Sequence, residues 1–68
     1  MHQFKTGDRY QINDGQDPPI IVEVEAVHDR LVQTITHISS NYKKVKRKGG
    51  QHKDTFQQLI DNGYLQKL

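Results

Sequence analysis

Two runs of alternating apolar residues, separated by a short polar turn, constrain this chain more than any other feature. The runs are IIVEVEAV at residues 20–27 and LVQTITHI at residues 31–38. Successive side chains of a strand point to opposite faces, so a period of two predicts β-strands. The intervening sequence His28-Asp29-Arg30 predicts a turn, and the two runs therefore predict an antiparallel hairpin.

The register of this hairpin depends on the length of its turn. A two-residue turn at Asp29-Arg30 places Val24 opposite Ile35, Val27 opposite Val32 and Ile21 opposite Ile38. A three-residue turn instead places Val24 against Thr34 and Val22 against Thr36. Cross-strand apolar pairs stabilise a sheet, so the two-residue turn is favoured. It leaves Glu23 and Glu25 on a solvated face opposite Thr36 and Thr34.

The segments on either side of the hairpin add further strands. Residues 8–12 alternate with Tyr10 and Ile12 on one face, and Phe4 can reach the same core. Residues 13–19, NDGQDPP, are a cluster of turn formers. Residues 42–48 predict a lysine-rich edge strand that Val45 anchors and Gly49-Gly50 ends.

The C-terminal part predicts one short helix. Thr55 and Gln58 have the spacing of a capping box, and Asp54 adds an acid at the helix start. Phe56, Leu59 and Ile60 form one apolar face, and Gly63 follows Asn62 as a C-cap signal. Tyr64, Leu65 and Leu68 can fold back onto the sheet.

Composition limits the kind of protein that these elements can build. Leu, Ile, Val and Phe make up 17 of 68 residues, enough for one small folded domain with a thin core, spanning residues 1–68. The absence of cysteine excludes disulfides and thiolate chemistry, and the polar N-terminus and short apolar runs predict no signal peptide and no membrane span. We therefore expect a cytoplasmic protein of the α+β class, mainly β, with three to five antiparallel strands in a small sheet or barrel and one short C-terminal helix.

The pattern FKTGDRYQINDG…IIVEVEAVHDRLVQTI, over residues 4–38, resembles the opening of a small SH3-like β-barrel, loosely of the KOW or Tudor type. A Gly-Asp precedes the first strand, and a loop, a valine-rich strand, a tight turn and a partner strand follow. The chain departs from the KOW pattern at Pro18-Pro19, where that family has a glycine-rich loop. The resemblance implies a barrel that binds nucleic acids, peptides or proteins, and no binding residue can be transferred.

Charge is distributed unevenly along the chain. Residues 1–40 carry three bases and six acids, whereas residues 41–68 carry seven bases and two acids. Six of the ten Lys and Arg residues lie within residues 41–53, NYKKVKRKGGQHK, which contain no acid. Dispersed cations bind phosphates, and an aromatic side chain can stack on a base. The candidate nucleic-acid-binding residues are Tyr42, Lys43, Lys44, Lys46, Arg47, Lys48, His52 and Lys53.

Other polar residues give no pattern that is typical of catalysis. The four histidines lack the spacing of a metal site, and Glu23 and Glu25 are typical of solvated strand residues. We therefore expect no catalytic residue, no metal and no cofactor. The preferred hypothesis is a non-enzymatic module that binds DNA or RNA without sequence specificity, because lysine outnumbers arginine in the basic segment.

Two other interpretations remain open at this point. The chain can be a protein-interaction module, an adaptor or inhibitor of the kind that phages and mobile elements encode, which binds a protein partner or forms a homodimer through an edge strand or the C-terminal helix. Alternatively, the lysines only keep an edge strand soluble. No interpretation involves a membrane.

Overall fold

The computed structural model describes residues 4–39 and 43–68. In these residues the chain forms five strands and one helix, which confirms the predicted α+β, mainly β, fold. The elements in chain order are β1 (Arg9–Ile12), β2 (Ile21–Val27), β3 (Leu31–Ser39), β4 (Lys44–His52), α1 (Lys53–Asp61) and β5 (Leu65–Lys67).

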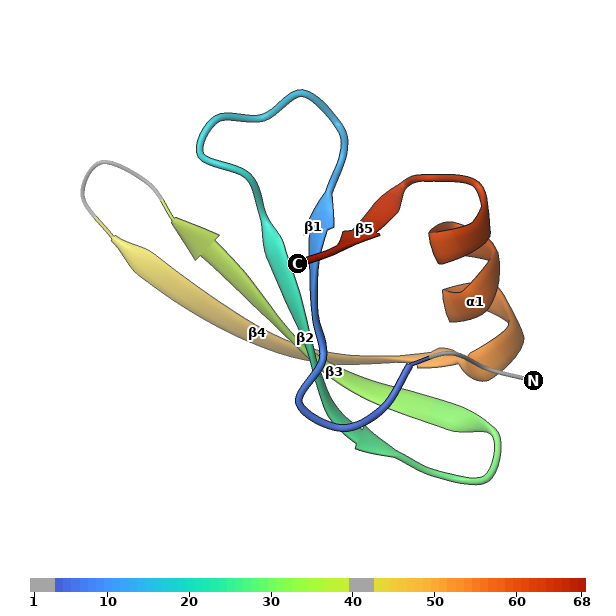
Figure 1. The fold of residues 1–68 in the computed structure, drawn as a ribbon. Helices are drawn as coiled ribbons and strands as arrows, with labels where there is room; N and C mark the ends of the chain where they lie inside the picture. Colours follow the sequence, from blue (N-terminus) through green and yellow to red (C-terminus); the bar gives the residue numbers. More distant parts are fainter. Residues whose placement is uncertain (1–3, 40–42) are drawn as a thin grey trace.

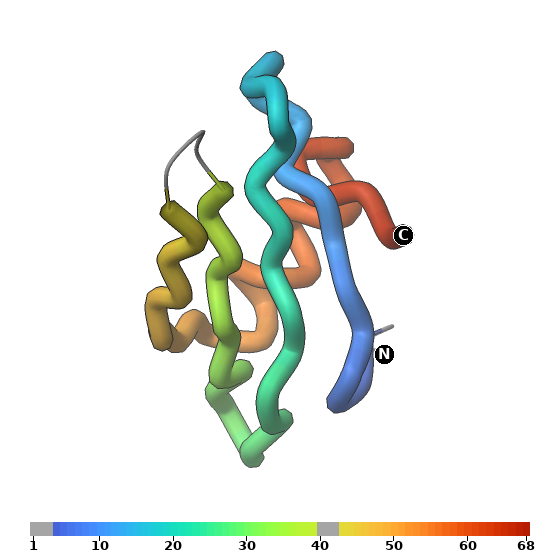
Figure 2. The backbone as a smooth tube through the Cα atoms, turned by 90° about the vertical axis from the view of Figure 1, so that its left-hand side faces the viewer, coloured from blue at the N-terminus to red at the C-terminus, as the bar shows by residue number. Residues whose placement is uncertain are grey.

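All described strand pairs are antiparallel, and the strands form one open sheet in the order β4-β3-β2-β1-β5. The sheet is strongly twisted, so β4 passes behind β2 and β1 on its way to the helix (Figure 1). Seen from the side, the chain forms a curled layer of strands with α1 on one side of it (Figure 2). The helix contacts β3, β4 and β5, and it thereby bridges the two edges of the sheet.

The β2–β3 hairpin confirms the two-residue turn but not the register that we derived from it. The amide of His28 donates to the carbonyl of Leu31, and Val27 lies opposite Val32, as predicted. The next pair, Ala26 with Gln33, keeps that register, and a β-bulge at Glu25 then shifts the pairing. Val24 therefore lies opposite Thr34, and the predicted pairing of Val24 with Ile35 is wrong.

The bulge changes which side chains of β2 face the core. Before it, Val22 and Val24 are buried; after it, Val27 packs against the core and Ala26 lies with Gln33 on the other face. An extra residue in one strand reverses the alternation of its side chains. Even-numbered Val22 and Val24 and odd-numbered Val27 can therefore all face the same core. Strict alternation through IIVEVEAV predicts that Ala26 is buried together with Ile20, Val22 and Val24, and the bulge makes that prediction wrong for Ala26.

The core lies between the sheet and α1. Its buried hydrophobic members are Phe4, Tyr10, Val22, Val24, Val32, Phe56 and Leu65. The helix contributes Phe56, whose ring meets those of Phe4 and Tyr10 edge to face, at centroid distances of 4.9 and 5.6 Å. Burial, together with the negative charge of Asp8 and a hydrogen bond to it, raises the pKa of the Tyr10 hydroxyl.

Strand β4 and helix α1 meet at a different point from the one that the sequence suggested. Gly49 and Gly50 do not end the strand, because β4 continues through both of them to His52. The helix begins at Lys53 with His52 as its N-cap, and the His52 ring accepts a hydrogen bond from the Asp54 amide. The capping box at Thr55 is therefore wrong: Thr55 lies inside the helix.

The end of the helix follows the prediction. Asn62 is the C-cap, and Gly63 has a positive φ of 84°, a conformation that glycine adopts without strain. Leu65 then returns to the core in β5, which pairs with β1. The chain thus ends beside its first strand.

Candidate functional site

Strand β4 is an edge of the sheet, and all nine of its residues are exposed. Its register with β3 fixes which face each side chain occupies. We call the face that carries the core the inner face and the opposite one the outer face. Lys44, Lys46 and Lys48 lie opposite Ser39, His37 and Ile35 on the outer face.

The remaining side chains of β4 lie on the inner face. Val45 is opposite Ile38, and Arg47 is opposite Thr36. The core does not cover this end of the strand, since Val45 is 39% exposed. The predicted tether is therefore weak, and β3 holds β4 mainly through the backbone ladder. The basic residues of the edge are consequently divided between two faces.

The outer lysines differ in their partners. Lys48 forms an ion pair with Glu25, with 3.7 Å between Nζ and Oε1. No ion pair is found for the side chains of Lys44, Lys46 or Arg47 within residues 4–39 and 43–68. Charged groups on an exposed edge that lack an internal partner remain available for an external anion.

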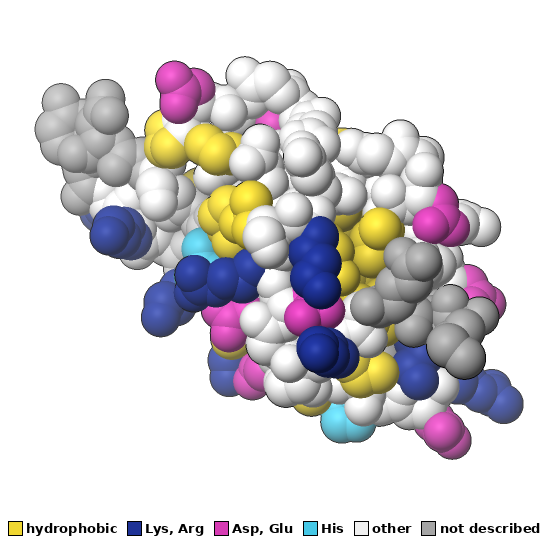
Figure 3. Space-filling view, in the orientation of Figure 1, with side chains coloured by type: hydrophobic (Ala, Val, Ile, Leu, Met, Phe, Trp, Pro, Cys, Tyr) yellow, Lys and Arg dark blue, Asp and Glu magenta, His cyan; other side chains and the backbone are white. Residues whose placement is uncertain are grey.

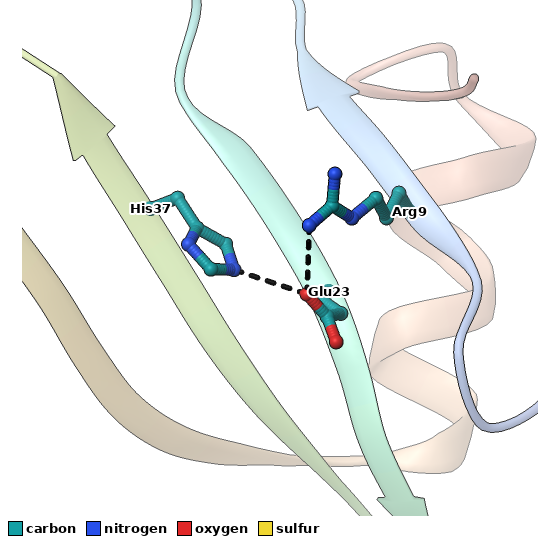
Figure 4. A network of polar contacts seen from close by, with 3 residues as sticks. All are labelled: Arg9, Glu23 and His37. Atoms are coloured by element: carbon teal, nitrogen blue, oxygen red, sulfur yellow. Dashed lines mark hydrogen bonds and ion pairs between the residues drawn. The ribbon is translucent and has the colours of Figure 1, made fainter.

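A second group of charges lies on the outer face, around Glu23 of β2. Figure 4 shows Arg9 and His37 reaching this carboxylate from the two neighbouring strands. His37 Nε2 lies 3.1 Å and Arg9 Nη2 lies 3.3 Å from the same oxygen, Oε1. The hydrogen bond from His37 is the main cause that lowers the pKa of Glu23; the hydrogen bond and charge of Arg9 act in the same direction, while partial burial opposes them.

The outer face is therefore mixed in charge rather than uniformly basic. Figure 3 shows Lys and Arg side chains next to Asp and Glu side chains on the face seen in Figure 1. The two glutamates of β2 and the three lysines of β4 lie on either side of β3. This arrangement gives a basic edge on β4 and a row of acids on β2, with β3 between them.

The structure brings together only part of the predicted basic site. Lys43 is exposed just before β4, and the four cations Lys44, Lys46, Arg47 and Lys48 lie within the strand. Tyr42 lies outside the described residues. His52 and Lys53 lie at the far end of β4, where His52 caps the helix and the half-buried Lys53 begins it. The residues that remain adjacent are Lys43 to Lys48.

The contacts of Glu23 and Glu25 were missed because they depend on the bulge. In the predicted register His37 would lie on the core face, opposite Val22, and could not reach Glu23. The bulge moves His37 to the outer face and brings Glu25 to Lys48. One alternative in the sequence analysis did contain the observed pairing: the three-residue turn also placed Val24 against Thr34.

Other classes of site give no further candidate. In residues 4–39 and 43–68 there is no group of three or more His, Cys, Asp or Glu side chains that could hold a metal ion. None of the helices described there is long and apolar enough to cross a membrane.

The fold and the basic edge together define a small, mainly β domain with one charged sheet edge. Comparison of the chain with models of protein families, with curated proteins and with solved structures finds no match.

Proposed function

We propose that this protein is a non-enzymatic module that binds nucleic acid without sequence specificity. The binding surface is the basic edge, which consists of Lys43, Lys44, Lys46, Arg47 and Lys48. One observation carries the proposal: Lys44, Lys46 and Lys48 stand at alternate positions along an exposed edge strand, so they present positive charge at intervals along it. A line of separated cations suits the regularly spaced phosphates of a nucleic-acid backbone.

The chemistry of the edge supports contact with phosphates rather than with bases. Four of its five cations are lysines, which act as point charges, whereas base reading relies on the fork of arginine. β4 contains no Phe, Tyr or Trp that could stack on a base, and its one histidine, His52, caps α1 at the end of the strand that is far from the lysines. The preferred ligand is therefore any DNA or RNA strand that presents phosphates to the edge.

Salt dependence of binding tests the proposal directly. We expect fluorescence anisotropy to show binding to single-stranded DNA, duplex DNA and RNA, with a dissociation constant of about 10⁻⁴ to 10⁻⁶ M at physiological salt. If three to five phosphates are neutralised, the log–log salt slope on duplex DNA is about −3 to −4.5. Binding that ignores salt would contradict the proposal.

A pair of charge-matched variants separates the basic edge from net charge. The double variant Lys44→Gln with Lys46→Gln removes two edge cations, and the slope should become shallower by about 2. The control, Lys5→Gln with Arg30→Gln, also removes two exposed cations, but from loops outside β4. An equal effect of both double variants would show that only net charge matters.

The proposal of an SH3-like barrel agrees with the course of the chain. Two features support it: the last strand returns to pair with the first, and α1 contacts both edge strands of the open sheet, β4 and β5. Small barrels of this type bind several classes of ligand, so the fold alone does not choose one.

A protein partner, bound by strand addition to β4, is the alternative function. Its signature would be partner binding that nuclease treatment and Lys→Gln changes leave intact.

A further inference from the structure

We infer that the polyanion lies along β4 on the outer face of the sheet, and that Glu25 limits its affinity by holding Lys48. This inference rests on the proposed function and specifies the track of the ligand and a residue that tunes binding. The inference predicts that Lys46 and Arg47, which are neighbours in β4, contribute differently to binding. The proposed function alone makes no such distinction.

The outer face holds the longer row of cations. Lys44, Lys46 and Lys48 occupy three successive outer positions of β4. Residues two apart in a strand are separated by about 6.7 Å, so the three lysine side chains leave the outer face at regular intervals along the strand. The inner face of the same strand offers only Arg47, between the exposed Val45 and Gly49. A ligand with repeated negative charges gains more contacts on the outer side.

The acids of β2 limit how far a bound polyanion can extend from β4 across the outer face. Glu23 and Glu25 lie on the outer face, separated from the lysine row by β3. A polyanion that crossed the sheet toward β2 would meet these carboxylates and be repelled. A path along β4 avoids Glu23 and meets Glu25 only where its carboxylate reaches Lys48. The charge pattern therefore favours a ligand that runs parallel to the edge strand.

Glu25 reaches the lysine row because of the bulge. It is the extra residue between Val24 and Ala26, and bulges commonly redirect a side chain. Its carboxylate lies 3.7 Å from Lys48 Nζ, across β3, while the Lys48 side chain remains 78% exposed. An exposed ammonium group with one internal carboxylate can exchange that partner for a phosphate. Glu25 and the ligand thus compete for Lys48.

The first experiment compares two adjacent cations on opposite faces. Lys46→Gln and Arg47→Gln each remove one charge from an exposed position of β4. We expect Lys46→Gln to reduce the log–log salt slope on duplex DNA by about 1, and Arg47→Gln to change it by less than half as much. Equal losses in the two variants would overturn the outer-face track while leaving the proposed function intact.

The second experiment removes the competitor. Glu25→Gln should bind duplex DNA about 1.5- to 5-fold more tightly, the range that an exposed ion pair is worth, and its salt slope should steepen because Lys48 is released. The control Asp61→Asn makes the same change in net charge on α1 and keeps the oxygen that accepts from Gln57. It should bind as the unmodified protein does.

The outcomes separate the inference from the function on which it rests. Equal tightening by Glu25→Gln and Asp61→Asn would show that only net charge acts, and it would overturn the role of Glu25. An unmodified protein that shows no salt-dependent binding to any nucleic acid would overturn the proposed function and the inference together. Thermal unfolding of each variant checks that all of them remain folded.

Discussion

At the scale of single residues, Glu23 shows how one carboxylate organises the outer face. It accepts hydrogen bonds from His37 on β3 and Arg9 on β1, and so it joins three strands through side chains. A carboxylate that is ionised can only accept, so His37 Nε2 must carry the proton that it shares. The contacts favour the ionised form of Glu23 and account for its lowered pKa.

The lowered pKa of Glu23 makes part of the folding free energy depend on pH. A group with a depressed pKa in the folded state contributes stability above its unfolded pKa, about 4.3, and loses it as pH falls through the lower folded value. We expect Glu23→Gln to lower the free energy of unfolding at pH 6–7, and to have a smaller effect near pH 3. Urea unfolding at both pH values measures the difference. The same loss at both would show that the charge of Glu23 contributes nothing.

At the scale of elements, alternation and turn chemistry predicted most of the sheet but could not locate the bulge. The existence of β1, β2, β3 and β4, the two-residue turn and the pair of Val27 with Val32 follow from the sequence, whereas β5 was not predicted as a strand. The extra residue at Glu25 does not, because its stabilisation comes from the whole core: both Val24 and Val27 pack inward only when the alternation is interrupted between them. No local preference in IIVEVEAV indicates that interruption.

The basic edge was predictable to the same extent. Lysine density indicated an edge strand, and β4 is one. The division of the cations between two faces could not be predicted without the register of β4 with β3. The ion pair of Lys48 with Glu25 could not be predicted without the bulge. The end of β4 was missed because Gly49-Gly50 is a turn signal that the ladder overrides here: neither glycine has a positive φ, and both pair with β3.

The glycines of β4 and of the helix end should therefore respond differently to alanine. A Cβ at Gly50 would lie 3.6 Å from the Val32 carbonyl oxygen, an ordinary contact, so Gly50→Ala should stabilise the fold by about 0.5–1 kcal/mol. Gly63 has a φ of 84°, so Gly63→Ala should destabilise it by about 1 kcal/mol or more. Chemical denaturation of both variants measures the two signs. Destabilisation by Gly50→Ala would mean that β4 needs a bare backbone at this position.

At the scale of the whole molecule, α1 packs against the core side of the open, curled sheet. The helix contacts both β4 and β5, the two edges, and its one buried side chain, Phe56, enters the core. That ring also meets Phe4 and Tyr10, which come from the other end of the chain. The packing of the fold therefore depends on one aromatic cluster that joins the N-terminal and C-terminal segments.

Phe56→Ala should consequently unfold a large share of the molecules rather than loosen one helix. Truncation of a buried phenylalanine costs about 3–5 kcal/mol, and a chain of this length has a total stability of roughly 3–10 kcal/mol. Circular dichroism in urea should show a strongly lowered midpoint, and amide exchange should show that β5 loses protection together with β2 and β3. Tyr64→Ala, at a position that is 43% exposed, serves as the control and should shift the midpoint little. If Phe56→Ala released α1 and β5 but left β2 and β3 fully protected, the sheet would fold independently of the helix, and the aromatic cluster would only attach the C-terminal segment to it.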